Sequence, residues 1–177
     1  MTADEFVDQV TRNGSEFLQA LLSLLETRQI EYCVIGGLAV NAYAEPVVSL
    51  DLDLVVVASR IEDLVAALEG QFKLTRFPHR INVSSVDSDL RVQIQTDPRY
   101  QPFVARSVRK TVLGRELRVA AVEDVLQGKI WAYSDLERRA SKRQKDLADI
   151  LRLLETQPGL KDRLPDDLRS AISRLGG

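Results

Sequence analysis

The fold is decided by residues 32–57, YCVIGGLAVNAYAEPVVSLDLDLVVV. The second half of this stretch reads as an apolar strand, in which successive side chains point to opposite faces. Asp51 and Asp53 therefore share one face, and Ser49 stands two positions before them. Their Cα atoms are expected roughly 6 to 7 Å apart. At an effective dielectric near 20, two carboxylates at that separation repel each other by about 2 to 3 kcal/mol. A bound cation would remove this repulsion.

The residue types of this acidic pair indicate which cation would bind. The strand offers carboxylate oxygens without histidine or cysteine, a set that suits hard ions better than zinc. We therefore expect Asp51 and Asp53 to bind Mg²⁺ or Mn²⁺.

Gly36 and Gly37 give the acidic pair a structural context. They end a buried strand, and a helix over residues 38–44 is expected to follow them. A Gly-Gly turn lets the backbone approach a ligand closely, and the start of a helix offers free N–H groups to a phosphate. The plainer alternative is a tight turn beside a solvated strand end. The Gly-Gly turn and the acidic pair together favour a single site that binds both a phosphate and a metal.

The order of these motifs resembles the nucleotidyltransferase superfamily of the DNA polymerase β type, in which a Gly-Gly turn precedes Asp-x-Asp on the next strand. The segment GGLAVNAYAEPVVSLDLDLVV most resembles the AbiEii-like branch of abortive-infection and toxin–antitoxin nucleotidyltransferases. That branch also carries a hydroxyl residue at the position of Ser49. The resemblance covers about residues 30–155. It implies an α/β fold of the α+β type, with a mixed sheet flanked by helices, and a two-metal transfer of a nucleoside monophosphate from an NTP.

A site of this superfamily normally adds a third carboxylate on a neighbouring strand, which helps to bind metal and accepts the proton of the attacking hydroxyl. In the expected strand 89–96, DLRVQIQT, Gln93 occupies that position. A glutamine oxygen can bind a metal, but a neutral amide is no general base. Asp97 is the reserve candidate, because a bend at Pro98 would be needed to bring it in.

Lys129 interrupts the apolar stripe of an expected helix over residues 122–133. A lysine in this position either snorkels along the protein body or points its ammonium at an anion in a cleft. We expect the second arrangement, with Lys129 contacting the triphosphate of a nucleotide.

The next expected helix, residues 136–156, begins with the cationic run RRASKRQK, a pattern that ordinarily marks a solvated helix face. Lys145, Asp146 and Asp149 nevertheless resemble the Lys-Asp-x-x-Asp motif that the AbiEii-like family carries after its helical lysine. We expect Arg143 to contact the triphosphate and Asp146 to orient a cation by a short-range pair. By the resemblance, Lys145 belongs to the same nucleotide-binding set.

Length and composition limit the other options. A chain of 177 residues suits one domain over 1–177, with 122–177 as a helical C-terminal part. There are 24 basic and 26 acidic residues, so a net charge of −2 provides no overall field for nucleic acid. The single cysteine, Cys33, excludes an intramolecular disulfide. Because no apolar run reaches 18 residues and no signal peptide is evident, we expect a cytoplasmic protein with no membrane partner.

Further elements are expected on the same grounds: helices over 3–10, 15–28, 61–69 and 166–175, strands over 31–35, 50–58, 72–76, 80–84 and 90–96, and a hairpin of 110–113 with 116–119. The leading function is a nucleotidyltransferase that uses an NTP, with RNA, a protein or a small molecule as acceptor and a toxin or antitoxin as a partner. Gln93 leaves a second interpretation open, a catalytically degenerate nucleotide-binding regulator or antitoxin-like protein. A third is a helical interaction protein in which the acidic pair is incidental.

Overall fold

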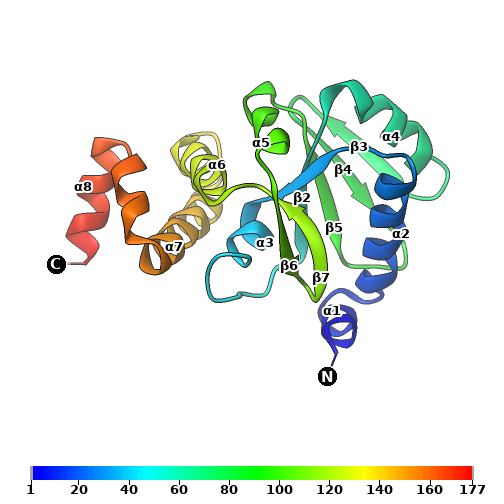
Figure 1. Cartoon of the computed structure of the whole chain (residues 1–177), viewed down its shortest axis with the longest axis horizontal. Helices are drawn as coiled ribbons and strands as arrows, with labels where there is room; N and C mark the ends of the chain where they lie inside the picture. Colours follow the sequence, from blue (N-terminus) through cyan, green and yellow to red (C-terminus); the bar gives the residue numbers. More distant parts are fainter. Residues whose placement is uncertain (1, 177) are drawn as a thin grey trace.

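The structure, a computed structural model, describes residues 2–176. A seven-stranded mixed sheet forms its centre, in the order β3-β4-β5-β2-β1-β7-β6 (Figure 1). The strands are β1 (Tyr32–Ile35), β2 (Asp51–Val56), β3 (Lys73–Phe77), β4 (Arg80–Ser84), β5 (Arg91–Gln95), β6 (Val108–Val112) and β7 (Arg115–Val119). The pairings β1–β7 and β2–β5 are parallel and the other pairings are antiparallel. The expected mixed α/β fold is confirmed.

Helices flank this sheet. They are α1 (Ala3–Thr11), α2 (Gly14–Thr27), α3 (Gly36–Val40), α4 (Ile61–Leu68), α5 (Pro102–Ala105), α6 (Val122–Ser134), α7 (Ala140–Thr156) and α8 (Asp166–Leu175), with 3₁₀ turns η1 (Ala58–Arg60), η2 (Pro98–Tyr100) and η3 (Pro158–Arg163). Figure 1 shows α6, α7 and α8 together on one side of the molecule and α2 and α4 on the opposite side. No helix within residues 2–176 is long and apolar enough to cross a membrane.

The apolar face of β2 builds the core. Leu52 and Leu54 pair with Val92 and Ile94 of β5, and all four side chains are fully buried. Each such side chain contributes about 1.5 to 3 kcal/mol through its removal from water. Since side chains alternate along a strand, this burial directs Asp53 to the other face of the sheet.

The register of the sheet fixes the two aspartates unequally. Asp53 lies between Ile35 of β1 and Gln93 of β5, so both of its neighbours belong to the sheet. Asp51 pairs only with Arg91 of β5, because the β1–β2 pairing ends at Asp53. The first residue of β2 therefore depends on the loop before it for its position.

Two helices begin elsewhere than the sequence predicts. The helix expected over 38–44 is α3, which starts at Gly36, where φ is +71°, and ends at Val40. The helix expected from residue 136 starts at Ala140, because the Asp135 side chain accepts a hydrogen bond from the N–H of Glu137 and holds a turn there. The short elements α5 and η2 were not predicted.

Candidate active site

A cavity of about 150 Å³ lies over Asp53, between the sheet and α6. Five of the predicted site residues line it: Gly36, Asp53, Gln93, Lys129 and Asp146. They come from α3, β2, β5, α6 and α7, so the fold gathers side chains that are more than 100 positions apart in the chain.

Asp53 has an unusual environment for a carboxylate. Burial raises its pKa to about 6, and although Lys129 acts in the opposite direction, the neighbouring Asp51 raises it further. The largest contributions to this pKa are burial and the charges of neighbouring side chains. The cavity thus penalises negative charge on Asp53 unless a cation compensates for it.

Gly36 is shaped around this carboxylate. Its φ of +71° lies in the left-handed region, and a Cβ at this position would come within 2.3 Å of Asp53 Oδ2. Only glycine meets both conditions. Gly37 lies further away, since a Cβ there would meet Ser49 Oγ at 3.9 Å and Asp149 Oδ2 at 4.0 Å.

Asp51 lies on the same face as Asp53 but does not line the cavity. Its Oδ1 is 2.7 Å from Arg91 Nε, an ion pair without hydrogen-bond geometry. Ser49 Oγ accepts a hydrogen bond from the N–H of Asp51 at 3.3 Å. Ser49 therefore supports the start of β2, in addition to any contact with a nucleotide.

These residues fit a divalent ion that is shared with a substrate. Within residues 2–176, no group of three histidine, cysteine or acidic side chains is arranged to hold a metal. Mg²⁺ is commonly bound by one or two carboxylates, with water and substrate phosphates completing the octahedron. Asp51 and Asp53 would supply the carboxylates, and the charge penalty on Asp53 would be relieved.

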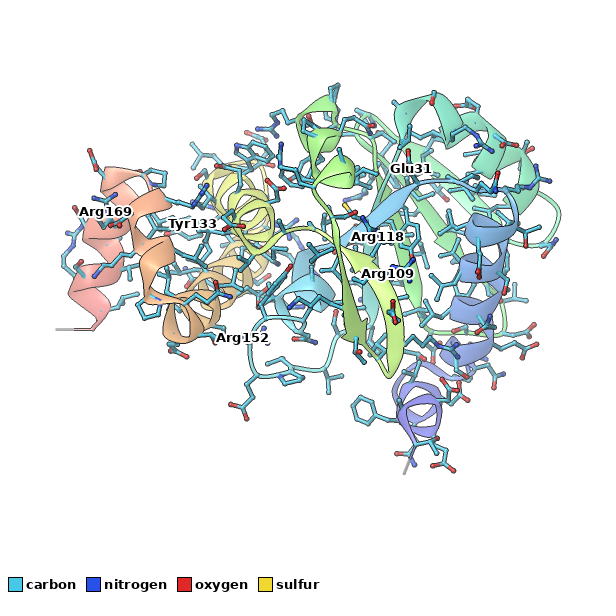
Figure 2. All side chains as sticks on the ribbon, in the orientation of Figure 1. Glu31, Arg109, Arg118, Tyr133, Arg152 and Arg169 are labelled. Carbon is cyan, nitrogen blue, oxygen red and sulfur yellow. The ribbon has the colours of Figure 1, made fainter. Side chains whose placement is uncertain are left out.

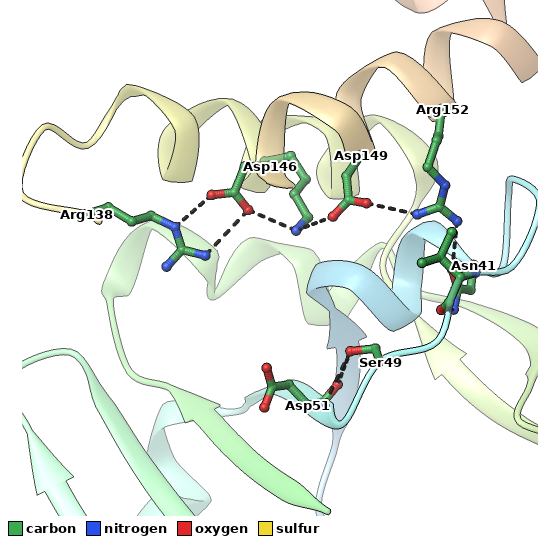
Figure 3. Close-up of polar contacts among 9 residues, drawn as sticks. Asn41, Ser49, Asp51, Arg138, Asp146, Asp149 and Arg152 are labelled. Carbon is green, nitrogen blue, oxygen red and sulfur yellow. Dashed lines mark hydrogen bonds and ion pairs between the residues drawn. The ribbon is translucent and has the colours of Figure 1, made fainter. Parts of the chain in front are cut away.

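Lys129 is held by two of the protein's own acids, Asp146 and Asp149, which Figure 3 labels on α7. Its Nζ lies 3.0 Å from Asp146 Oδ1 and 2.7 Å from Asp149 Oδ2. Burial alone would lower the pKa of Lys129, but Asp149 and Asp146 raise it, so the lysine stays charged. The side chain is 9% exposed and does not snorkel. The expected short-range pair of Asp146 is not what the structure shows, because its cationic partners, Lys129 and Arg138, lie 17 and 8 positions away in the chain.

Within the cationic run before α7, Arg138 rather than Arg143 reaches the cavity. Arg138 Nε donates to Asp146 Oδ2 at 2.7 Å, and its side chain lines the cavity. Arg143 instead donates to the Tyr133 carbonyl at 2.7 Å and lies over the Tyr133 ring, so the structure does not bring it to the site. Tyr133 is labelled in Figure 2. Lys145 is exposed and does not line the cavity, although its charge lowers the pKa of Asp53.

Asp97 does not join Asp53 either. The bend at Pro98 leads into η2, and the Asp97 side chain caps this turn by accepting from the N–H of Arg99. The Arg99 guanidinium also pairs with it, at 2.9 Å, which lowers the pKa of Asp97. Asp97 lines a neighbouring cavity of about 690 Å³. A carboxylate bound in this way is a weak base.

Sequence reasoning missed the residues that the two cavities share, among them Arg80, Gln95, Tyr100 and Arg138. Two of them carried a signal. Gln95 has the same strand parity as Gln93, and Arg138 opens the cationic run before α7. Arg80 is the first residue of β4 and Tyr100 lies in the 3₁₀ turn η2, two positions at the ends of short elements where periodicity does not mark a face.

Comparisons with known proteins identify the family of the chain. A family model described as the nucleotidyl transferase AbiEii toxin of a type IV toxin–antitoxin system matches residues 25–176. No curated protein sequence matches the chain.

Several solved structures share the fold at low sequence identity. One is ANT(2")-Ia in complex with adenylyl-2"-tobramycin, at a TM-score of 0.59 and 15% identity, with 92% of this chain and 98% of that chain covered. A nucleotidyltransferase-like protein from Paracoccidioides brasiliensis gives 0.55 and 18%, covering 88% and 84%. The lincomycin-bound lincosamide adenylyltransferase LnuA gives 0.50 and 14%, covering 77% and 95%. With the family match over most of its length, the chain belongs to the AbiEii family of nucleotidyl transferase toxins.

Proposed function

We propose that this protein is a metal-dependent nucleotidyltransferase that moves a nucleoside monophosphate from an NTP to a hydroxyl group. The observation that carries the proposal is that Asp53 has no ion-pair partner. The cavity has two other acids, and each is paired, Asp124 with Arg106 and Asp146 with Lys129. Of the three, Asp53 alone forms no ion pair with a side chain among residues 2–176, and the charges of Lys129 and Arg138 lower its pKa without offsetting the effect of burial.

Mg²⁺ or Mn²⁺ would be held by Asp51 and Asp53, with the Gln93 amide oxygen as a neutral neighbour. The ion would neutralise the phosphates of the bound nucleotide and orient them. Arg138 and Lys129 face the same cavity and provide positive charge for the triphosphate. Gly36, which has no side chain, leaves room for phosphate beside Asp53.

In the transfer, the acceptor oxygen forms a bond to the α-phosphorus, the bond to the β-phosphate oxygen breaks, and pyrophosphate leaves. The hydroxyl proton has to go elsewhere. Gln93 cannot take it, since an amide is not basic, and Asp97 is bound to Arg99. We therefore assign the proton to solvent water and expect a slow turnover.

The acceptor is proposed more broadly, as a hydroxyl of RNA, of a protein or of a small molecule. Family membership favours an antitoxin as the genetic partner, and the NTP requirement favours action in the cytoplasm. A second candidate function rests on Gln93: a protein that binds nucleotide without catalysis and acts as a regulator.

Calorimetry with Mg²⁺ and each NTP in turn, followed by detection of pyrophosphate, separates the two candidates. The proposal predicts Mg²⁺-dependent NTP binding and slow pyrophosphate release in the presence of an acceptor. Binding without release for any acceptor class would favour the regulator. A lack of NTP binding would contradict both.

A further inference from the structure

Arg152 of α7 is tied to the loop that leads into β2. Its Nη1 donates to Asp149 Oδ1 at 2.8 Å, and its Nη2 donates to Asn41 Oδ1 at 2.8 Å and to the Glu45 carbonyl. Figure 3 shows this path from Asp149 through Arg152 to Asn41. The Arg152 side chain is 18% exposed, so these bonds form largely out of contact with water. Arg152 thus connects α7 with loop 41–47.

Asn41 closes the same loop on itself. Its Nδ2 donates to the Val47 carbonyl at 2.7 Å, and its Oδ1 accepts from the N–H of Val47 at 3.0 Å. Val47 and Val48 are about half exposed, at 51% and 53%, so side-chain packing does little to fix this segment. Tyr43 anchors the first half of the loop by donating its hydroxyl to the Ala120 carbonyl at 2.8 Å. The second half, up to Val47, is held by the polar contacts that converge on Asn41 and Arg152.

The position of this loop matters most for Asp51. Asp53 has a sheet neighbour on both sides, whereas Asp51 has β5 on one side only. The remaining constraint on Asp51 comes from the residues before it, through Ser49, whose hydroxyl bonds the Asp51 backbone. Displacement of the loop would move Asp51 and leave Asp53 in place.

We propose that Arg152 is a positioning residue for metal binding, which fixes loop 41–47 from α7 and thereby sets Asp51. The inference rests on the proposed function, since that function assigns Asp51 to the metal. Asp149 accepts from Arg152 through one oxygen and contacts Lys129 through the other. The same carboxylate thus joins the loop to the cationic side of the cavity.

The test compares Arg152→Met with Arg169→Met as a matched control. Arg169 of α8 also holds a connecting segment, by donating to the carbonyls of Asp162 and Leu164 at 3.2 and 3.1 Å, and it lies in the most C-terminal helix, away from β2 (Figure 2). Mn²⁺ affinity is measured by electron paramagnetic resonance, with the melting temperature recorded alongside. Arg152→Met should bind Mn²⁺ roughly tenfold more weakly, the effect of losing a group that orients a metal ligand. Arg169→Met should bind Mn²⁺ with native affinity.

Two further variants separate positioning from general stability. Arg152→Lys keeps a charge beside Asp149 but cannot span Asn41 and Asp149 with one ammonium, so it should recover the melting temperature without recovering Mn²⁺ affinity. Asn41→Ala removes the contact of Arg152 with Asn41 and the bonds that close the loop at Val47, and leaves the bonds of Arg152 to Asp149 and to the Glu45 carbonyl intact. It should weaken Mn²⁺ binding to the same extent as Arg152→Met, and the double variant should show no further loss. Native Mn²⁺ affinity in Arg152→Met would overturn the proposal.

Failure of the proposed function has a different signature. If the native chain itself binds no Mn²⁺, the metal assignment fails, and the role of Arg152 is decided by amide hydrogen exchange over residues 45–50. Faster exchange there in Arg152→Met than in the native chain would support the positioning role. Equal exchange would overturn it.

Discussion

Asp53 of β2 lies directly opposite Gln93 of β5 in the parallel pairing, and Asn82 of β4 lies opposite Gln93 on its other side. This row across the sheet therefore carries one carboxylate and two neutral amides. In the proposed site a metal would have to rely on Asp51 and Asp53, and β5 provides no acid beside them to accept a proton.

Replacing Gln93 by aspartate tests this arrangement. A third carboxylate beside Asp53 should strengthen Mn²⁺ binding by about tenfold, or 1.4 kcal/mol. Without metal, Gln93→Asp should lower the free energy of unfolding by about 0.2 to 1 kcal/mol, because like charges then lie directly opposite each other. Gln95→Asp, two positions further along and opposite Val55, is the control. Weaker Mn²⁺ binding in Gln93→Asp would contradict the placement of Gln93 beside the metal.

Gly36→Ala should be damaging for two reasons that a control can separate. Gly70 also has a positive φ, of +88°, but a Cβ there would meet nothing within 4 Å. Gly70→Ala should cost about 1 to 2 kcal/mol from backbone strain alone. Gly36→Ala adds the clash with Asp53 Oδ2 and should cost more, with loss of Mn²⁺ binding. Chemical denaturation measures both, and equal costs would show that Asp53 moves aside freely.

Lys129→Met removes the cation between Asp146 and Asp149. Because the two acids are buried, the free energy of unfolding should fall by about 3 kcal/mol, although Arg138 and Arg152 still pair with them. NTP affinity should fall as well, by about 1.5 to 3 kcal/mol for a lost charged hydrogen bond. Urea titration and calorimetry measure the two effects. We expect the double variant Lys129→Met with Asp149→Asn to recover stability but not NTP binding. Native stability in Lys129→Met would contradict the buried pair.

Asp97 predicts a specific pH dependence. The side-chain hydrogen bond from Arg99 holds the pKa of Asp97 below its usual value. The ionised carboxylate therefore stabilises the fold fully above about pH 4, and this contribution is lost as pH falls through the lowered pKa. Asp97→Asn should be less stable than the native chain at pH 7 and should lose less stability between pH 4 and pH 2. Parallel curves for the two proteins in urea titrations across this range would refute the pairing.

The parts of the fold that alternate in the sequence could be predicted. The apolar parity of Leu52 and Leu54 placed Asp51 and Asp53 on one face, and the same parity placed Gln93 on the polar face of β5. The start of α7 could not be predicted, because the residues of the Asx turn at Asp135 have a composition similar to that of the helix that follows them.

Side-chain pairing in the site was also beyond the sequence. Helical spacing put Arg143 on a plausible face, but only the path of the 135–139 turn decides that Arg138 reaches Asp146. The partners of Lys129 were missed for a related reason. Asp146 and Asp149 belong to another helix than Lys129. The hydrophobic periodicity of α6 and α7 does not predict the angle at which the two helices pack.

The most direct test of the metal-dependent site is Mg²⁺-dependent NTP binding in the variant that carries both Asp51→Asn and Asp53→Asn. The variant should remain folded, since burial already penalises the charge on Asp53. We expect calorimetry to show NTP binding that requires Mg²⁺ in the native chain and no Mg²⁺-dependent binding in the double variant. Unchanged Mg²⁺-dependent NTP affinity in the folded double variant would contradict the assignment of Asp51 and Asp53 to the metal.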